Sequence, residues 1–493
     1  MSSVYRPSRP INVEEVSKWD IEADVVVVGF GAAGSCAAIE ARNVGAKTVI
    51  FEVAAGGGGS AALSGGELYL GGSGGTPVQR AAGFEDTTED FYEYLVMSWG
   101  PAADLQKERL YADTAGKHFY WLLSQEVPFK NTYLTGKLLE PTTDDTLVYS
   151  GSEAAWPFVQ RAKPCPRGHA VQMEGWGAGK KLMECLTHKA ESLGAEVHYS
   201  SRALTLITDG RASVVGLVVR VDSEVRFVRT KSAVILTAGG FICNKKMVRQ
   251  YAPKALVCKG QTTGGYDDGS GIRMGIGVGA ATTQMEQFFC TMPYFPPDSL
   301  VKGIFVNELG NRFINEDAYH GRVTQYILRQ PNGRAWLLLD NNIFERPITN
   351  LDVEIHSVGE TWSEVEQELE LPTGALTHTV EQFNRFAQEG LDPLYHKDSA
   401  WLKPLDEPPF AALSYCTADY PASAFTLGGL STLPTGQVLD SDGEIINGLY
   451  AAGRTACGLP CWGDSYSSGL SLGDSTFFGR QAGMHAGSIN RQL

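Results

Sequence analysis

Residues 24–34 read Asp-Val-Val-Val-Val-Gly-Phe-Gly-Ala-Ala-Gly, and this stretch decides the fold of the chain. The four valines are typical of a strand buried on both faces, and the glycines predict a tight turn into an alanine-rich helix that runs to about Asn43. A second short strand, residues 47–51, ends directly before Glu52. This strand–helix–strand unit predicts the first part of a doubly wound, mostly parallel sheet.

Gly29, Gly31 and Gly34 form the pattern GxGxxG between the first strand and the helix. The first glycine permits the turn, the second lets a pyrophosphate approach the helix N-terminus, and the third lets helix and strand pack closely. Glu52 is placed to accept hydrogen bonds from an adenosine ribose and disfavours a 2'-phosphate. We therefore expect a dinucleotide to bind here, although the pattern alone leaves NAD and FAD open.

The rest of the sequence predicts a domain that is interrupted by a second one. Residues 196–237 break into short β-branched runs, typical of a β-meander that feeds a last strand at 233–237. Residues 286–424 contain proline breaks and two amphipathic helices; Ser363 with Glu366 predicts the cap of one, and the apolar face of the other is formed by Leu376, Val380, Phe383 and Ala387. Residues 448–453 return to strand and turn, and 475–489 predict a closing helix.

We therefore expect an α/β fold with two domains. A Rossmann-like dinucleotide-binding domain with a β-meander comprises residues 1–285 and 425–493. It is interrupted by an inserted α+β catalytic cap domain, residues 286–424.

Composition limits the partners that we expect. The chain has 493 residues and 41 Lys+Arg against 56 Asp+Glu, a formal charge of -15, so neither nucleic acid nor an anionic membrane is expected as a partner. No apolar stretch reaches the ~18 residues of a membrane span. The polar N-terminus lacks a secretory signal, and the nine cysteines then predict reduced thiols and a cytoplasmic location. Cys165 and His169 lack a second ligand pair, so no metal is expected.

Further glycine-rich motifs accompany the first one, at residues 60–66, 237–241, 310–316, 426–429, 448–454 and 469–473. With these motifs in this order, nearly the whole chain resembles the fumarate reductase and succinate dehydrogenase flavoprotein superfamily. The resemblance implies FAD, with the glycine-serine loop along the flavin, and makes the first domain an FAD-binding domain. The implied FAD-binding residues are Gly29, Gly31, Ala33, Gly34, Glu52, Ser60, Ser64, Gly65, Gly66, Ala238, Gly239, Asp268, Gly453, Arg454, Ser471 and Leu472.

Departures from the family pattern are equally informative. Members that attach FAD covalently carry a histidine where this chain has Gly59, so we expect noncovalent FAD. Fumarate-type enzymes carry a histidine where this chain has Phe425 and an arginine where it has Tyr466. They also carry a proton-donating arginine where it has His320. A dicarboxylate needs charge-assisted arginine contacts, so fumarate and succinate are not expected as substrates.

Neutral side chains replace the missing arginines, and they resemble the 3-ketosteroid dehydrogenase branch. In that branch a tyrosine hydroxyl and a glycine amide, here Tyr466 and Gly469, hold the ketone. Ser468 and Tyr319 make the resemblance nearest to the Δ4-(5α) type, which introduces a double bond beside the 3-keto group, between carbons 4 and 5. Its reaction combines proton abstraction with hydride transfer to flavin. We assign Ser468 as base and Tyr319 as its relay to solvent, two roles that could be exchanged.

The resemblance implies a small apolar steroid as substrate and leaves the electron acceptor unknown. Two alternatives stay open. One is a 3-ketosteroid Δ1-dehydrogenase, or another FAD-dependent enone reductase or dehydrogenase; the Δ1 relatives have a longer loop and a further N-terminal tyrosine not placed in this chain. The other is a nonenzymatic FAD-binding subunit of a complex. The three polar side chains Tyr319, Tyr466 and Ser468 argue against this alternative.

Overall fold

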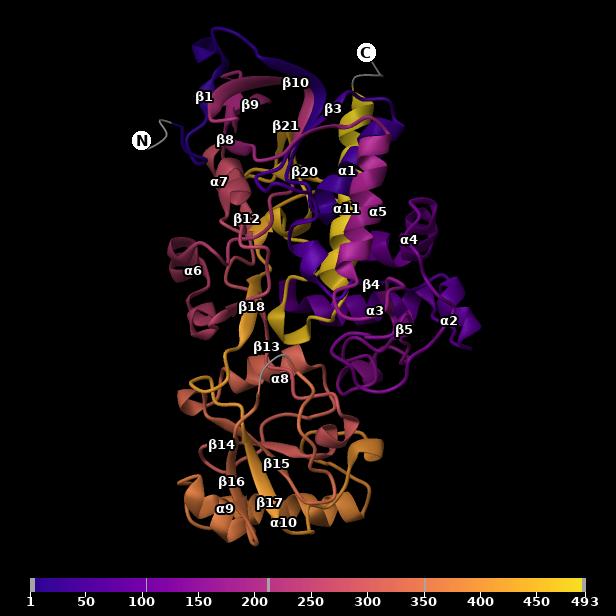
Figure 1. The fold of residues 1–493 in the computed structure, drawn as a ribbon, viewed down its shortest axis with the longest axis vertical. Helices are drawn as coiled ribbons and strands as arrows, with labels where there is room; N and C mark the ends of the chain where they lie inside the picture. Colours follow the sequence, from indigo (N-terminus) through magenta and orange to yellow (C-terminus); the bar gives the residue numbers. More distant parts are fainter. Residues whose placement is uncertain (1–4, 103, 211–212, 350–351, 490–493) are drawn as a thin grey trace.

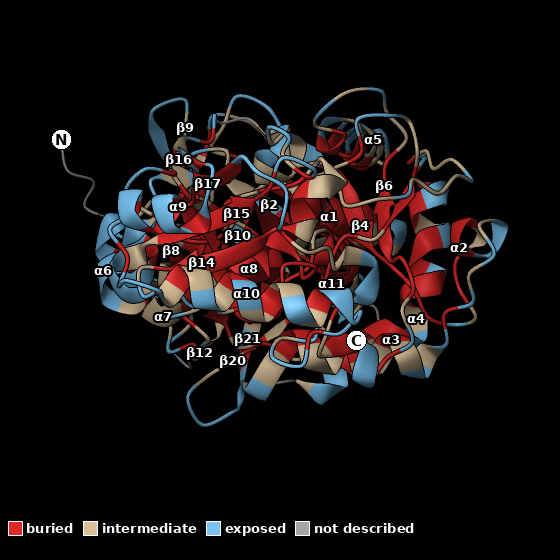
Figure 2. Ribbon diagram, turned by 90° about the horizontal axis from the view of Figure 1, so that it is seen from below, coloured by how far each residue is buried: buried red, intermediate tan, exposed pale blue. Residues whose placement is uncertain are grey.

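The computed structural model describes residues 5–102, 104–210, 213–349 and 352–489. Figure 1 shows two lobes along the long axis of the molecule. The larger lobe contains a wide sheet with helices beside it, and the smaller lobe contains a four-stranded sheet with two short helices at its outer end. Seen from below, along the long axis, buried residues lie in the middle of the ribbon and exposed residues mostly at its outside (Figure 2).

The wide sheet confirms the predicted opening unit. Its strands are β1 (Ile11–Asn12), β2 (Ile21–Val28), β3 (Thr48–Phe51), β7 (Glu196–His198), β8 (Arg202–Thr208), β9 (Val214–Val221), β10 (Glu224–Leu236), β20 (Gln437–Leu439) and β21 (Ile445–Ala451). Strand β2 lies between β10 and β3 and is parallel to both. Helix α1 (Ala32–Asn43) connects β2 to β3. Because both faces of the sheet are covered, Val25, Val26 and Val27 are fully buried.

Strand β10 corrects one expectation about the β-meander. On one edge its first half pairs antiparallel with β9 and its end pairs parallel with β21, while on the other edge residues 228–236 pair parallel with β2, so the last strand is not separate. The pairing with β2 is interrupted by a bulge between Thr230 and Ala233. The Thr230 hydroxyl donates to the Asp24 carbonyl at 2.6 Å and accepts from the Ala233 N–H at 3.1 Å. This side chain closes the bulge and lets one strand continue through two pairings.

Helix α11 (Leu470–Ser488) packs closely along α1. It begins five residues before the predicted start at 475, because Gly469 adopts φ +91° and is the N-cap. A Cβ at Gly479 would collide with the Ala33 carbonyl, and one at Gly483 with the Ala37 carbonyl. Small residues therefore allow the C-terminal helix to complete the lobe that α1 begins.

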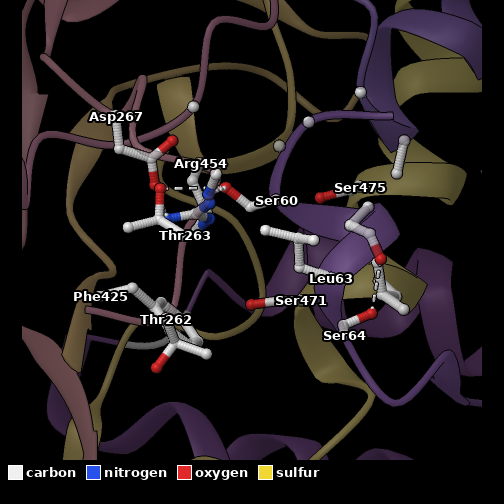
Figure 3. Close-up of a pocket in the computed structure, with 18 of the residues that line it drawn as sticks. Ser60, Leu63, Ser64, Thr262, Thr263, Asp267, Phe425, Arg454, Ser471 and Ser475 are labelled. Atoms are coloured by element: carbon white, nitrogen blue, oxygen red, sulfur yellow. Dashed lines mark hydrogen bonds and ion pairs between the residues drawn. The ribbon is translucent and has the colours of Figure 1, made fainter. Parts of the chain in front are cut away.

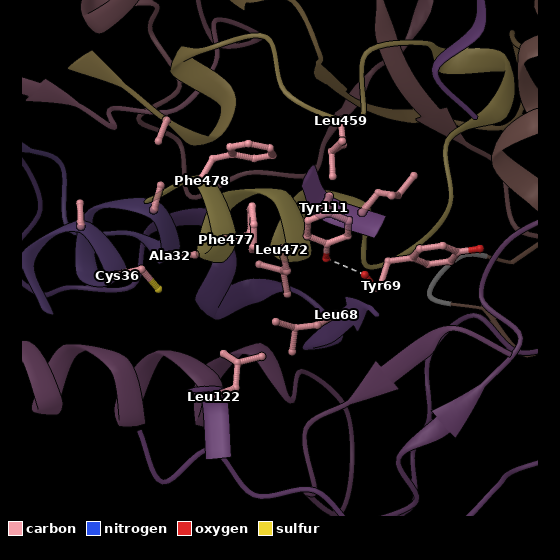
Figure 4. Packing of buried hydrophobic residues seen from close by; sticks show 14 of the residues in the cluster. Ala32, Cys36, Leu68, Tyr69, Tyr111, Leu122, Leu459, Leu472, Phe477 and Phe478 are labelled. Atoms are coloured by element: carbon pink, nitrogen blue, oxygen red, sulfur yellow. Dashed lines mark hydrogen bonds between the residues drawn. The ribbon is translucent and has the colours of Figure 1, made fainter. Parts of the chain in front are cut away.

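The other helices of this lobe are α2 (Pro77–Ala81), α3 (Thr88–Trp99), α4 (Leu105–Ser124), α5 (Gly179–Ser192), α6 (Lys245–Tyr251) and α7 (Ser270–Gly277). A small antiparallel sheet, β4 (Glu67–Tyr69), β5 (Leu147–Val148) and β6 (Gly168–Ala170), lies beside α11. Figure 4 shows Leu68 and Tyr69 among Leu472, Phe477 and Tyr111, whose hydroxyl donates to the Tyr69 carbonyl at 2.6 Å. These contacts fix β4 next to the first turn of α11.

The smaller lobe has its own buried cluster. Its elements are β14 (Ile304–Asn307), β15 (Ala335–Leu339), β16 (Ile355–Gly359), β17 (Phe410–Ser414), α8 (His320–Ile327), α9 (Trp362–Glu368) and α10 (Ala375–Gln388). The predicted apolar face of α10 is confirmed, because Leu376, Val380, Phe383 and Ala387 are all buried. The predicted cap of α9 is wrong: Thr361 and Glu364 form the capping box, and Glu366 instead accepts hydrogen bonds from the N-terminal backbone of α10.

Two strands connect the lobes. The chain enters the smaller lobe after β13 (Phe288–Thr291) and returns through β18 (Ser423–Thr426), which pairs antiparallel with β13. Strand β11 (Gly260–Gln261) extends this pair on the other edge of β18, while β12 (Thr282–Thr283) pairs with β19 (Gly429–Leu430). Phe289 and Phe425 are direct partners in the β13–β18 ladder, so this ladder lies at the junction of the two lobes.

All nine cysteines are free thiols. Within the described ranges, no group of three or more His, Cys, Asp or Glu side chains is arranged to hold a metal ion. No described helix has both the length and the apolar character needed to cross a membrane.

Candidate active site

A cavity of about 780 Å³ extends from the N-terminus of α1 to β13, β18 and the first residues of α11. We call it the central cavity. Figure 3 shows the side chains of Ser60, Arg454, Phe425 and Ser471 around it. Its volume lies in the upper part of the range for small-molecule and cofactor sites, about 300–1,000 Å³.

The turn between β2 and α1 forms one end of the central cavity. Gly29 has φ +101°, and a Cβ there would lie 2.6 Å from the Thr237 carbonyl oxygen. A Cβ at Gly34 would collide with the Gly29 carbonyl. At Gly31, the N-cap of α1, a Cβ would be 3.8 Å from its nearest neighbour, and no side chain caps the helix. The first N–H groups of α1 are thus accessible to a pyrophosphate.

Glu52 lies beside this turn and lines the cavity. Its two carboxylate oxygens accept hydrogen bonds from the Phe30 N–H at 2.7 Å and the Ala54 N–H at 2.8 Å. A carboxylate has about four lone-pair sites, so these two bonds orient the group and leave acceptor capacity for hydroxyl groups of a ribose. This arrangement fits the predicted dinucleotide.

The glycine-serine loop forms a second wall. The Ser60 hydroxyl accepts from the Gly264 N–H at 3.1 Å, and the Ser64 hydroxyl donates to the Ala61 carbonyl at 2.7 Å. These bonds hold the short turn that precedes Gly65 and Gly66. Every residue predicted to bind FAD except Gly34 lines the cavity, and Gly34 instead fits α1 against β2.

Two arginines line the central cavity, and each has an aspartate partner. Arg202 Nη1 lies 2.7 Å from Asp268 Oδ2, and Arg454 forms an ion pair with Asp267. The Arg454 guanidinium also lies over the Phe425 ring, 5.1 Å from its centroid. Arg454, which was predicted to bind FAD, therefore lies against the Phe425 ring. Asp268, also predicted to bind FAD, is ion-paired with Arg202.

Two of the three predicted catalytic hydroxyls, those of Tyr319 and Ser468, meet in the central cavity. Tyr319 and Ser468 are 149 positions apart in sequence, and their oxygen atoms lie 3.0 Å apart. The Phe289 ring packs against Tyr466 at a centroid distance of 4.5 Å and against Tyr319 at 6.2 Å. Phe289 is a site residue that the sequence analysis missed, because only pairing with β18 brings it into the cavity.

The backbone around Ser468 is firmly held. Its N–H donates to the Ser150 carbonyl at 2.9 Å, and the Ser150 hydroxyl donates to the Ser468 carbonyl at 2.9 Å. Within the described part of the chain, no group accepts a hydrogen bond from the Gly469 N–H, which precedes α11. A free N–H at a helix N-terminus can bind a ligand oxygen.

Burial shifts the pKa values of Tyr466, Tyr319 and His320. It raises the pKa of the Tyr466 hydroxyl to about 12, although Ser471 at the start of α11 partly opposes the rise. Burial also raises the pKa of Tyr319 well above its usual value. It lowers the pKa of His320 to about 3, so the side chain at the family's arginine position is neutral at pH 7. Trp462 packs on Gly100 and does not line the cavity.

The sequence motif around Asn315 has a positioning role. Arg312 forms buried ion pairs with Glu316 at 2.8 Å and Asp392 at 3.1 Å, and Lys397 lies 3.2 Å from Glu316. This network fixes the segment that leads into Tyr319. The Tyr319 N–H then donates to the Ser152 hydroxyl at 3.1 Å, which ties the segment to the larger lobe.

A family model described as FAD binding domain matches residues 24–463. The chain is similar to the crystal structure of 3-ketosteroid-delta4-(5alpha)-dehydrogenase from Rhodococcus jostii RHA1 in complex with 4-androstene-3,17-dione. The two are 40% identical with a TM-score of 0.92, and the match covers 97% of this chain and 99% of that chain.

Two curated relatives are more distant. The 3-oxo-5-alpha-steroid 4-dehydrogenase of Comamonas testosteroni is 27% identical over 88% of this chain and 93% of its own length. A probable fumarate reductase of Shewanella frigidimarina is also 27% identical, over 94% of this chain and 74% of its own length.

Proposed function

The chain belongs to the family of proteins that share this FAD binding domain, and we propose that it is an FAD-dependent 3-ketosteroid dehydrogenase. The reaction introduces a double bond between carbons 4 and 5 of 3-keto-5α-steroids. The observation that carries the proposal is the contact between Tyr319 and Ser468 beside Tyr466, in an aromatic cavity whose two arginines are ion-paired. The protein is an oxidoreductase that acts on CH–CH groups.

The residues of the central cavity fit FAD. The uncapped N-terminus of α1 would hold the pyrophosphate and Glu52 the ribose, while the loop around Ser64 and the start of α11 would hold the flavin. When bound, FAD supplies the acceptor for the electron pair removed from the substrate. No cation is left unpaired in the described lining, which supports an uncharged substrate.

We assign the ketone of the substrate to Tyr466 and Gly469. The Tyr466 O–H and the Gly469 N–H would donate to the ketone oxygen and stabilise the negative charge that develops when carbon 4 loses a proton. Ser468 would accept that proton, and Tyr319 hydrogen-bonds to Ser468. The Phe289 ring packs against Tyr466 and provides an apolar wall beside these groups.

The division into two domains stays a proposal, with an FAD-binding domain of residues 1–285 and 425–493 and a cap domain of residues 286–424. The separate buried cluster of the smaller lobe supports it. Strands β13 and β18 lie at the two junctions and pair with each other. A cytoplasmic location and an unidentified electron acceptor likewise stay predictions.

We predict that the protein purifies yellow and that acid precipitation releases its FAD into the supernatant. Gly59 stands where relatives with covalent flavin carry a histidine. Among the described residues that line the central cavity, the one histidine is His320. The check is an absorbance spectrum of supernatant and pellet after precipitation. Flavin colour that stays in the pellet would contradict noncovalent binding.

Anaerobic mixing with saturated 3-keto-5α-steroids should bleach the flavin and yield Δ4 products. Succinate should be oxidised at least about 100-fold more slowly, because burying a carboxylate without a cation costs several kcal/mol. Stopped-flow absorbance measures the bleaching, and NMR locates the new double bond. Equal rates with succinate, or a double bond between carbons 1 and 2, would refute the proposed reaction.

A further inference from the structure

One buried carboxylate in the central cavity has no role in the reaction so far. Glu67 is the first residue of β4, is 7% exposed and lines the cavity. We infer that Glu67 accepts, through Ser468, the proton that leaves carbon 4 of the steroid. This inference rests on the proposed function and adds the final proton acceptor of that site.

The backbone places Glu67 beside Ser468. The Tyr69 N–H donates to the Gly469 carbonyl at 3.1 Å, so β4 runs alongside the turn that carries Ser468. A Cβ at Gly469 would lie 3.2 Å from the Glu67 carbonyl oxygen. On its other edge, β4 pairs with β6, where Glu67 is opposite Ala170. Glu67 is therefore held on a strand rather than on a mobile loop.

Ser468 lies between Tyr319 and Glu67. Its hydroxyl is 3.0 Å from the Tyr319 hydroxyl, and on its other side it interacts with the Glu67 carboxyl, which lowers the pKa of Glu67. Among the described residues, the hydrogen-bond partner of the Tyr319 hydroxyl is Ser468. In the inferred route, the proton passes from Ser468 to Glu67.

The proton transfer balances without another reactant. The C–H bond at carbon 4 breaks, its electron pair stays on the substrate, and the proton goes to Ser468 Oγ. The original hydroxyl proton of Ser468 moves to a carboxylate oxygen of Glu67. Ser468 ends with the same number of protons as before, so it needs no depressed pKa to act as a relay.

The surroundings make Glu67 a stronger base than an ordinary carboxylate. Burial raises the pKa of Glu67 to about 8, the carboxylates of Glu140 and Glu153 add to the rise, and the interaction with Ser468 opposes it. The other titratable groups that it faces are the hydroxyls of Tyr319 and Tyr466. Glu67 must be ionised to accept a proton, so steroid oxidation should increase as the pH rises through about 8.

The test compares the FAD-loaded wild type with Glu67→Gln, Glu67→Asp and Glu140→Gln, using a 3-keto-5α-steroid between pH 6 and 10. Glu67→Gln should lower the plateau rate of flavin bleaching by about tenfold or more and remove the increase near pH 8. Glu67→Asp should restore part of both. Glu140→Gln removes a neighbouring like charge, so it should keep the plateau rate and move the increase to lower pH.

A second measurement separates this inference from the proposed function. The reduced enzyme in D₂O should exchange the hydrogens at carbon 4 of the saturated ketosteroid, measured by NMR, and Glu67→Gln should lose this exchange. If the wild type oxidises the steroid while Glu67→Gln, with normal FAD content, keeps the wild-type pH profile and exchange, the role of Glu67 is refuted. If the wild type oxidises no ketosteroid, the proposed function fails, and the inference fails with it.

Discussion

Replacing Tyr466 by phenylalanine is expected to lower kcat/KM for a 3-keto-5α-steroid by about 100-fold to 1,000-fold, the usual loss of one oxyanion donor, ~3–4 kcal/mol. The phenyl ring should occupy the same place, because Phe289 and Phe425 pack on Tyr466 at centroid distances of 4.5 and 5.6 Å. The Gly469 N–H would remain as the second donor, so residual turnover should persist.

The control for Tyr466→Phe is Tyr450→Phe. Tyr450 is also buried, but its hydroxyl lies 2.7 Å from His485 Nδ1, and Tyr450 does not line the central cavity. Tyr450→Phe should therefore keep steroid oxidation close to the wild-type rate. Anaerobic flavin bleaching measures the effect, and FAD content is compared by absorbance. Near-normal oxidation by Tyr466→Phe with full FAD content would remove Tyr466 from the mechanism.

The sequence was sufficient for the parts of the fold that depend on local patterns. The turn at Gly29, helix α1 and the apolar face of α10 are confirmed, since neighbouring residues alone determine the periodic burial and the glycine geometry. The cap of α9 was misplaced by two positions, because both Thr361 and Ser363 have a glutamate three residues later. Only the structure shows that Glu366 is used by the next helix.

The residues of the active site could not be identified from local sequence patterns alone. Resemblance to a family brought Tyr319 and Ser468 into one hypothesis, and the structure places their hydroxyls 3.0 Å apart. Phe289 and Glu67 were missed, because contacts between distant segments bring them into the site: pairing with β18 for Phe289, and the hydrogen bond between β4 and the Gly469 carbonyl for Glu67. For Glu67 a signal did exist: a charged residue directly after Gly65 and Gly66 begins a strand that is otherwise apolar.

Replacing Ser468 by alanine is expected to lower the rate of steroid oxidation about 1,000-fold, within the usual range for losing a positioned proton acceptor. Alanine keeps the backbone bonds between residue 468 and Ser150, so FAD should remain bound. The control is Ser467→Ala, whose hydroxyl lies 2.7 Å from the Tyr94 hydroxyl and which does not line the central cavity. It should retain most of the wild-type rate.

A double-mutant cycle with Tyr319→Phe tests how the two hydroxyls act. Tyr319→Phe alone should also remove most turnover, because it removes the hydrogen-bond partner that orients Ser468. Since we expect both hydroxyls to serve one proton route, the double variant should be no slower than Ser468→Ala alone, and the losses should not add. Additive losses would mean that Tyr319 acts on the substrate independently of Ser468. Near-normal oxidation by Ser468→Ala with unchanged FAD content would exclude Ser468 as the proton acceptor.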